Sequence, residues 1–312
     1  MNKHVRQVVL PLIAALIWGA AFLVQGSITD RLGAFTVNAL RSFIAFITLF
    51  VISVLIDTGK KRKNIPMGKP DFKKIIIGSS VCGIFLFLGS NFQQLALSGN
   101  IEGAVTEGEV AFITAFYMVL VPVFGIFLGK KTGINVWASA IIAIVGLYLI
   151  CVEGAEFSMN RFVIFAIMNA VAYALHILAV DKYVQNVDPI KLCCGQFFFN
   201  CVFSTIFALI FDTITFAAII DCIIPILYIG IFSSSIAFTL QLVAQKGGNP
   251  TVVSVLVCME SVFALLLQTL YGAFFPEKAV YMSVNQYIGC GVMFVAVIIS
   301  QIEMPFKFHK TK

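Results

Sequence analysis

Long apolar runs separated by short polar segments extend over almost the whole chain. A helix needs about 20 apolar residues to cross the hydrocarbon core of a bilayer. Runs of about this length cover residues 8–28, 35–56, 75–97, 110–128, 136–151, 162–180, 190–211, 222–244, 252–272 and 286–301. Within each run the apolar residues are continuous and do not alternate with a period of two. The pattern therefore predicts ten transmembrane helices and not the strands of a membrane β-barrel.

The composition excludes most classes of soluble protein. Of the 312 residues, 60% are hydrophobic and only 12% are charged, whereas soluble domains average about 45–50% apolar and about 25% charged residues. So few charges cannot cover a globular surface, and so apolar a chain is not disordered. The longest polar stretch, residues 57–74, is too short to form a soluble domain. We therefore predict an all-α polytopic membrane protein whose chemistry lies within the membrane.

The distribution of Lys and Arg among the loops predicts the orientation in the membrane. If the chain starts inside, 17 of its 21 Lys and Arg residues lie in inner loops and tails, and 3 lie in outer loops. Because inner loops carry an excess of positive charge, we expect a multi-pass protein of the plasma membrane with both termini cytoplasmic. This bias accounts for the net charge of +6, so the lipid bilayer is an expected partner and nucleic acid is not.

The eight cysteines lie in the apolar runs or at their ends. No two of them have the CxxC spacing, and no histidine stands near them at the spacing of a metal site. We expect them to pack as small apolar side chains. The sequence therefore predicts no metal and no cofactor.

The second half of the chain weakly repeats the first half. One alignment of the halves, called the first alignment, matches Trp18 with Tyr173; the second alignment has a slightly smaller offset and matches residues 112–117 with residues 255–260. Five helices in each repeat is an odd number, so the two copies must cross the membrane in opposite directions. Inverted repeats are typical of secondary transporters, in which the substrate site lies near the midplane of the membrane between the repeats.

This arrangement predicts the organisation of the chain. Residues 1–152 form the first five-helix repeat, residues 153–304 form the second, inverted repeat, and residues 305–312 form a cytoplasmic tail. An alternating-access carrier uses such symmetry to make two exchangeable conformations, which a channel or a receptor seldom needs.

Short segments in a fixed order along nearly the whole chain indicate a family. They are residues 15–19 (ALIWG), 94–97 (QLAL), 112–124 (FITAFYMVLVPVF), 241–246 (QLVAQK), 250–251 (PT), 259–264 (MESVFA) and 286–291 (QYIGCG). In this order they resemble the drug/metabolite transporter superfamily, in particular its ten-helix carriers with two EamA repeats. The resemblance implies a helical basket around a central cavity that exports amino acids, metabolites or drug-like compounds, driven by an ion gradient, often of protons. The chain differs from the family in a longer connection, residues 98–110, which leaves the start of the fourth helix open.

Two charged residues within the runs are the leading candidates for function, because a charge at membrane depth costs about 2.5–3.5 kcal/mol on insertion scales. Glu260 lies about eight residues, or roughly 12 Å, from the inner end of its run. We predict that Glu260 exchanges protons during transport; the alternative is a hydrogen-bonded carboxyl that packs helices. Arg41 lies nearer the outer end of its run. It can bind a substrate carboxylate, pair with Glu109 or extend to the membrane surface.

Other polar and aromatic side chains within the runs complete the predicted substrate site. The predicted substrate-binding residues are Trp18, Arg41, Asn91, Gln94, Tyr117, Tyr173, His176, Gln241, Gln245 and Glu260. Most have a structural alternative, because amides hydrogen-bond between membrane helices, a lone histidine packs in the interior, and mid-span aromatic rings fill the core. The mixture of amide and aromatic groups suits amino acids, nucleobase-like compounds and cationic drugs alike.

Two other functional classes are alternatives to a carrier. An intramembrane enzyme needs a set of catalytic groups near one leaflet, but two of the three histidines lie in tails and no HExxH, GxSxG or P-loop motif is present. A solute channel would show charge rings or faces of small residues, and neither stands out. We therefore predict a non-enzymatic, secondary-active exporter of small organic solutes, driven by proton exchange. The solute and the oligomeric state stay open, with a homodimer as one option.

Overall fold

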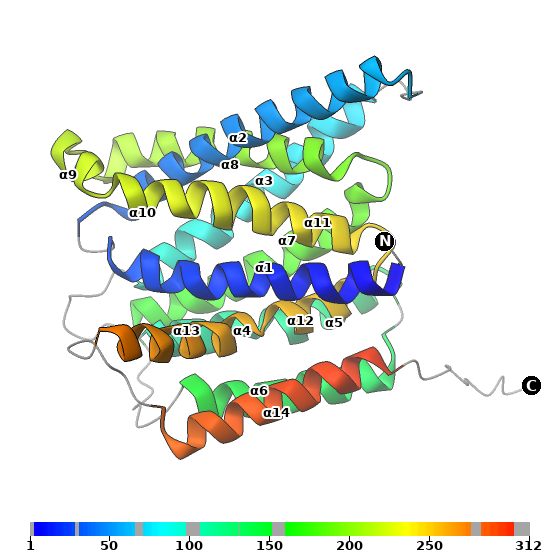
Figure 1. Cartoon of the computed structure of the whole chain (residues 1–312), viewed down its shortest axis with the longest axis vertical. Helices are drawn as coiled ribbons and strands as arrows, with labels where there is room; N and C mark the ends of the chain where they lie inside the picture. Colours follow the sequence, from blue (N-terminus) through cyan, green and yellow to red (C-terminus); the bar gives the residue numbers. More distant parts are fainter. Residues whose placement is uncertain are drawn as a thin grey trace, which may run out of the picture.

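The computed structural model describes residues 3–28, 31–65, 71–97, 107–130, 132–151, 160–275 and 282–302, without the side chains of 3–5 and 107–109. Figure 1 shows the helices: α1 (Lys3–Gly26), α2 (Ala34–Arg62), α3 (Phe72–Leu97), α4 (Glu107–Ala115), α5 (Tyr117–Phe127), α6 (Ile134–Cys151), α7 (Arg161–Val184), α8 (Pro189–Phe211), α9 (Phe216–Asp221), α10 (Ile223–Tyr228), the π-helix η1 (Ile229–Ala237), α11 (Phe238–Gln245), α12 (Pro250–Val257), α13 (Glu260–Phe274) and α14 (Val284–Gln301). Within the described residues, ten helical segments are long and apolar enough to cross a membrane. The predicted all-α architecture with ten transmembrane helices is confirmed.

Some boundaries differ from the sequence prediction or lie outside the described residues. The helix of the fourth span begins at Glu107, before the predicted run, and the short helix α9 precedes the eighth span. Glu109, predicted as a partner of Arg41, has its side chain outside the described part. The predicted boundary between the repeats at residues 152 and 153 and the predicted tail, residues 305–312, also lie outside it.

The two repeats run through the bundle in opposite directions. Arg6, near the start of α1, donates a hydrogen bond to Lys246 O after α11 (2.6 Å), and Gln185, after α7, donates to Gln245 O (3.2 Å). The beginning of α1 and the end of its counterpart α7 therefore lie at the same end of the bundle, as Figure 1 shows. Helix α2 packs along α8, and α6 packs along α14. Each of these pairs joins a helix to its own counterpart, as a two-fold relation between inverted repeats requires.

The charged side chains are distributed unevenly over the two ends of the bundle. We call the end where α1 begins the basic end; among the described residues it carries Arg6, Lys60, Lys61, Arg62, Lys63, Lys73, Lys74, Lys130, Lys182, Lys191 and Lys246. At the opposite end, called the distal end, Asp212 accepts hydrogen bonds from Thr36 N (2.7 Å) and Thr36 Oγ1 (2.8 Å). This carboxylate caps the N-terminus of α2, where an anion is favoured, and joins the two repeats.

The fourth and ninth spans are interrupted at equivalent positions. Phe116 separates α4 from α5, and Met259 lies immediately before α13. At each break the backbone N–H bonds to the carbonyl of the preceding turn, Phe116 N to Ile113 O and Met259 N to Leu256 O, both at 3.2 Å. A bond of this kind tightens the helix by a turn of 3₁₀ type. The second alignment of the halves matches Phe116 with Met259, so both repeats carry the same break.

The second alignment also matches two glycines at which α6 and α14 lie in close contact. A Cβ atom on Gly146 would lie 3.0 Å from Gly289 O and 2.9 Å from the Met293 Cγ atom, and a Cβ atom on Gly289 would lie 2.8 Å from Gly146 O. Small residues of this kind allow membrane helices to pack backbone against backbone. The close contact therefore depends on the absence of a side chain on both helices.

Replacing Gly146 with Val is expected to lower the free energy of unfolding by about 1–3 kcal/mol, because the new side chain must displace the Gly289 carbonyl. Thermal unfolding in detergent micelles measures the effect. Gly291→Val on α14 is the matched control, since a Cβ atom on Gly291 meets nothing within 4 Å. An equal loss of stability in both variants would show that the α6–α14 contact is not sensitive to side-chain volume.

Candidate functional site

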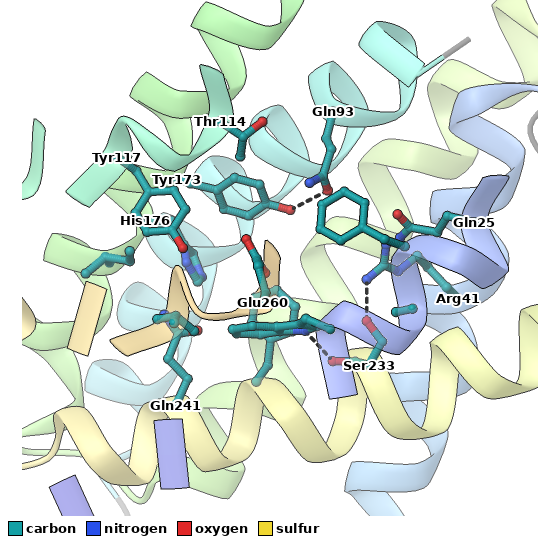
Figure 2. Close-up of a pocket in the computed structure, with 16 residues that line it drawn as sticks. Gln25, Arg41, Gln93, Thr114, Tyr117, Tyr173, His176, Ser233, Gln241 and Glu260 are labelled. Atoms are coloured by element: carbon teal, nitrogen blue, oxygen red, sulfur yellow. Dashed lines mark hydrogen bonds between the residues drawn. The ribbon is translucent and has the colours of Figure 1, made fainter. Parts of the chain in front are cut away.

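A cavity of about 60 Å³ lies in the interior of the bundle, with walls from both repeats. The predicted site residues that line it are Trp18, Arg41, Tyr117, Tyr173, His176, Gln241 and Glu260. Figure 2 labels all of them except Trp18 and shows the labelled side chains converging from α2, α5, α7, α11 and α13. We call this space the central cavity.

Equivalent positions of the two repeats face each other across the central cavity. In the first alignment the matched lining pairs are Trp18 and Tyr173, Ala21 and His176, and Phe22 and Ile177; in the second alignment they are Thr114 and Val257, and Tyr117 and Glu260. Tyr117 and Glu260 are each the first residue after the break in their span. The cavity therefore lies between the two repeats. A carrier built from inverted repeats binds its substrate at this position.

Glu260 is the acidic side chain of the central cavity. Figure 2 shows it in the middle of the cavity, pointing toward Tyr173, with Arg41 on one side and His176 on the other. Among the described residues the Glu260 carboxylate forms no ion pair and no hydrogen bond. Glu260 is the first residue of α13, at the positive end of the dipole of that helix, which favours a negative charge. A carboxylate without a fixed partner is free to interact with a solute or a proton.

Arg41 is the basic side chain of the same cavity and is 5% exposed. Its Nε atom donates to Ser234 Oγ (2.9 Å) and its second terminal nitrogen to Ser233 Oγ (3.4 Å), both on the π-helix η1. Trp18 Nε1 donates to the Ser233 carbonyl (3.1 Å). Arg41 therefore does not extend to the surface, and its guanidinium is held in place by hydroxyl groups while its charge stays uncompensated by any described acid.

Some residues that line the central cavity also carry polar atoms without a hydrogen-bond partner in the described part of the protein. His176 Nε2 is 3.0 Å from Gln196 Oε1, while the buried Nδ1 atom on the other side of the ring has no partner in the described part of the protein. The same is true of Gln241 Oε1 and Thr114 Oγ1. Because buried polar atoms are almost always hydrogen-bonded in folded proteins, these atoms are available for a polar solute or for water.

Three predicted site residues do not line the central cavity. Asn91 bridges helices, since it accepts from Asn38 Nδ2 (3.2 Å) and donates to Ser204 Oγ (3.1 Å). Gln245 donates to Ile177 O (3.2 Å) between α11 and α7. Gln94 is buried on α3 away from the cavity.

Several lining residues were not selected from the sequence. They include Phe22, Gln25, Gln93, Thr114 and Ser233. Gln93 takes the position expected of Gln94 and accepts a hydrogen bond from Tyr173 Oη (3.3 Å). Adjacent side chains point in directions about 100° apart around a helix. The sequence shows that a pair of glutamines is present, but not which of the two faces the cavity.

A polar network joins elements of both repeats at the basic end of the bundle. Lys130, just after α5, forms an ion pair with Asp181 on α7, whose side chain is 7% exposed. Partial burial lowers the pKa of the Lys130 ammonium, and the neighbouring carboxylate favours its charged form. Gln185 joins the same region to the loop after α11, because its Oε1 atom accepts from Gly247 N (2.9 Å). The network ties the end of the fourth span to the second repeat.

Among the described residues, no group of three or more His, Cys, Asp and Glu side chains is placed to hold a metal ion. The model of the EamA-like transporter family matches residues 6–152 and 160–301. The chain belongs to the EamA-like transporter family. It is therefore a membrane transporter of small solutes.

Similarity to individual proteins agrees with this family. A protein of Archaeoglobus fulgidus, described as an uncharacterized transporter, is 27% identical over 293 residues, which cover 94% of this EamA-like transporter and 84% of that protein. A crystal structure of a protein with 17% sequence identity superposes with a TM-score of 0.75 and covers 95% of each chain. That likeness shows the fold of the transporter. Family membership favours a protein that moves solutes over one that transforms them.

Proposed function

We propose that the protein is a secondary-active exporter of small organic solutes that exchanges solute for protons in the central cavity. One observation carries the proposal: the Glu260 carboxylate lines a cavity between the two inverted repeats and has no ion pair among the described residues. In the proposed cycle, the ionised carboxylate is available while solute binds from the inner side. A proton taken up on the outer side then neutralises Glu260, releases the solute and returns inward with the carrier.

The walls of the central cavity support a solute that combines polar groups with an apolar or aromatic part. Arg41 and Glu260 present opposite charges, and Trp18, Tyr117 and Tyr173 present rings. The proposed solutes are amino acids, metabolites or drug-like compounds that contain both features. At about 60 Å³ the cavity is smaller than the roughly 150 Å³ that accommodates benzene in a protein interior. The carrier must therefore widen this cavity when the solute binds.

The proposed orientation places the basic end of the bundle at the cytoplasmic surface of the plasma membrane, with both termini inside. The excess of Lys and Arg at that end supports it. Asn91, Gln94 and Gln245 are proposed to act in helix packing, since none of them lines the central cavity.

Transport by purified protein in sealed vesicles tests the proposal. A panel of radiolabelled amino acids and organic cations is offered to vesicles whose interior is more acidic than the outside. We expect at least one solute to accumulate, because protons leaving the vesicle drive solute inward, and we expect a protonophore to abolish the accumulation. Preloading with the same unlabelled solute should accelerate labelled uptake, since only an alternating site shows this counterflow. Uptake that is indifferent to the protonophore would contradict proton exchange, and uptake without counterflow would indicate a channel.

A further inference from the structure

A second cavity, of about 220 Å³, lies toward the distal end of the bundle. It is bounded by α1, α4, α6, α13 and α14, and its polar wall is formed by Cys151, Ser261, Gln268 and Gln286. Gln286 is held in position, because it donates to Ile150 O (3.3 Å) and accepts from Ser283 N (3.0 Å). We call this space the distal cavity.

The distal cavity and the central cavity are neighbours along α1 and α13. Phe22 lines both of them and therefore lies between the two spaces. Glu260 faces the central cavity, while the next residue, Ser261, faces the distal cavity together with Ala264, Leu265 and Gln268. These positions follow the spacing i, i+3, i+4 and i+7, which is one face of a helix. A solute that leaves the central cavity past Phe22 therefore meets this face of α13.

The inverted repeat allows the residues of the distal cavity to be compared with the equivalent residues at the basic end. The second alignment matches Ser261 with Met118, Ala264 with Val121 and Ile150 with Met293, and each of these counterparts is 0% exposed. In the first alignment Phe22 corresponds to Ile177, which is 3% exposed. These positions thus line a cavity at the distal end, whereas their matched counterparts at the basic end are buried. An alternating-access carrier requires this difference between its two ends.

The size and chemistry of the distal cavity define what it can hold. Its volume of about 220 Å³ exceeds the roughly 150 Å³ that holds benzene in a protein interior. None of its described lining residues is charged, and Phe22, Leu23, Ile150 and Leu265 form apolar walls. Ser261, which is 5% exposed, has a buried Oγ atom whose described polar neighbour is the Cys151 thiol, a weak hydrogen-bonding group. The cavity therefore suits an uncharged ring that carries one hydrogen-bonding group.

We propose that the distal cavity is a second binding site, which takes the uncharged aromatic or aliphatic ring of a small solute and hydrogen-bonds it through Ser261. As a station on the transport route, the site rests on the proposed function. As a binding site, it stands independently of proton exchange and can be tested without measuring transport.

Alkylation of the native cysteines tests the site, with indole as the probe. Indole carries one aromatic ring system and one N–H donor, and Cys151 lies in the cavity wall. Purified protein is treated with N-ethylmaleimide, and modification of each cysteine is followed by peptide mass spectrometry. We expect millimolar indole to slow modification of Cys151 at least fivefold. Cys201 on α8, which is also half-buried, serves as the internal reference and should be unaffected.

Filling the distal cavity from either wall should remove the protection. Ala264→Phe on α13 and Ala111→Phe on α4 each place a ring in the space, so in either folded variant Cys151 should react at the same rate with and without indole. Glu260→Gln should retain the protection, because Glu260 does not line the distal cavity. The proposal is overturned if indole does not protect Cys151 in the unmodified protein, if it slows Cys201 equally, or if protection survives the filling substitutions. None of these outcomes depends on whether protons drive transport.

Discussion

Substitution of Glu260 by Gln is expected to reduce solute accumulation driven by a pH gradient at least tenfold. Gln has the shape of a protonated glutamic acid but cannot release a proton. The variant can therefore no longer couple the movement of solute to the movement of protons. Proteoliposomes with an acidic interior measure the effect. The fold should persist, because the Glu260 carboxylate has no described ion pair to lose and the substitution removes a charge from the membrane interior. Thermal unfolding should therefore change little or shift upward.

Glu260→Asp is the matched control for the exchanging group. It keeps a carboxylate on α13 and shortens the side chain by one methylene, so accumulation should be weaker but should still respond to the pH gradient. Full gradient-driven accumulation in Glu260→Gln would show that a group other than Glu260 exchanges the proton. Asp181 on α7 is the acidic side chain that is buried in the described spans.

Substitution of Lys130 by Met is expected to destabilise the basic end of the bundle by about 2 kcal/mol. The Asp181 side chain is 7% exposed and would keep only a 3.4 Å hydrogen bond from Gln185 Nε2. Removing one partner of a buried pair costs about 3–5 kcal/mol because a charge is left uncompensated. The expected value is smaller here, because the Lys130 side chain is 33% exposed and water screens the pair. The midpoint of thermal unfolding in detergent measures the loss.

The reciprocal substitution distinguishes the cost in stability of leaving a buried charge unpaired from the cost of losing a contact. Asp181→Asn leaves the one-third exposed Lys130 ammonium to be hydrated, so it should cost clearly less than Lys130→Met. The double variant should be nearly as stable as Asp181→Asn alone, since no buried carboxylate then remains. Equal losses in the two single variants, adding fully in the double variant, would mean that the ion pair contributes nothing to closing this end.

Much of the fold followed from the sequence because the membrane allows few alternatives. Backbone groups in lipid must be hydrogen-bonded within a helix or a closed barrel, and a long continuously apolar run fits only the helix. The second alignment, which is visible in the sequence, also matches the helix breaks at Phe116 and Met259 and the contact between Gly146 and Gly289. Local hydropathy and duplication thus determined the number of spans, their inverted arrangement and the equivalence of the two helix breaks.

The tertiary structure decided which polar side chains face the cavity. Gln93 lines it while Gln94 does not, and Gln241 lines it while Gln245 hydrogen-bonds to the Ile177 carbonyl. In a soluble protein, the polar face of a helix marks the outside. Lipid is as apolar as the packed interior, so a transmembrane helix carries no comparable sign of its rotation. The interruptions of the fourth, eighth and ninth spans, including the π-helix that presents Ser233 to Arg41, rotate the cavity-lining positions further. The sequence therefore determined what the spans contain, and only their packing against one another decided which residues meet in the cavity.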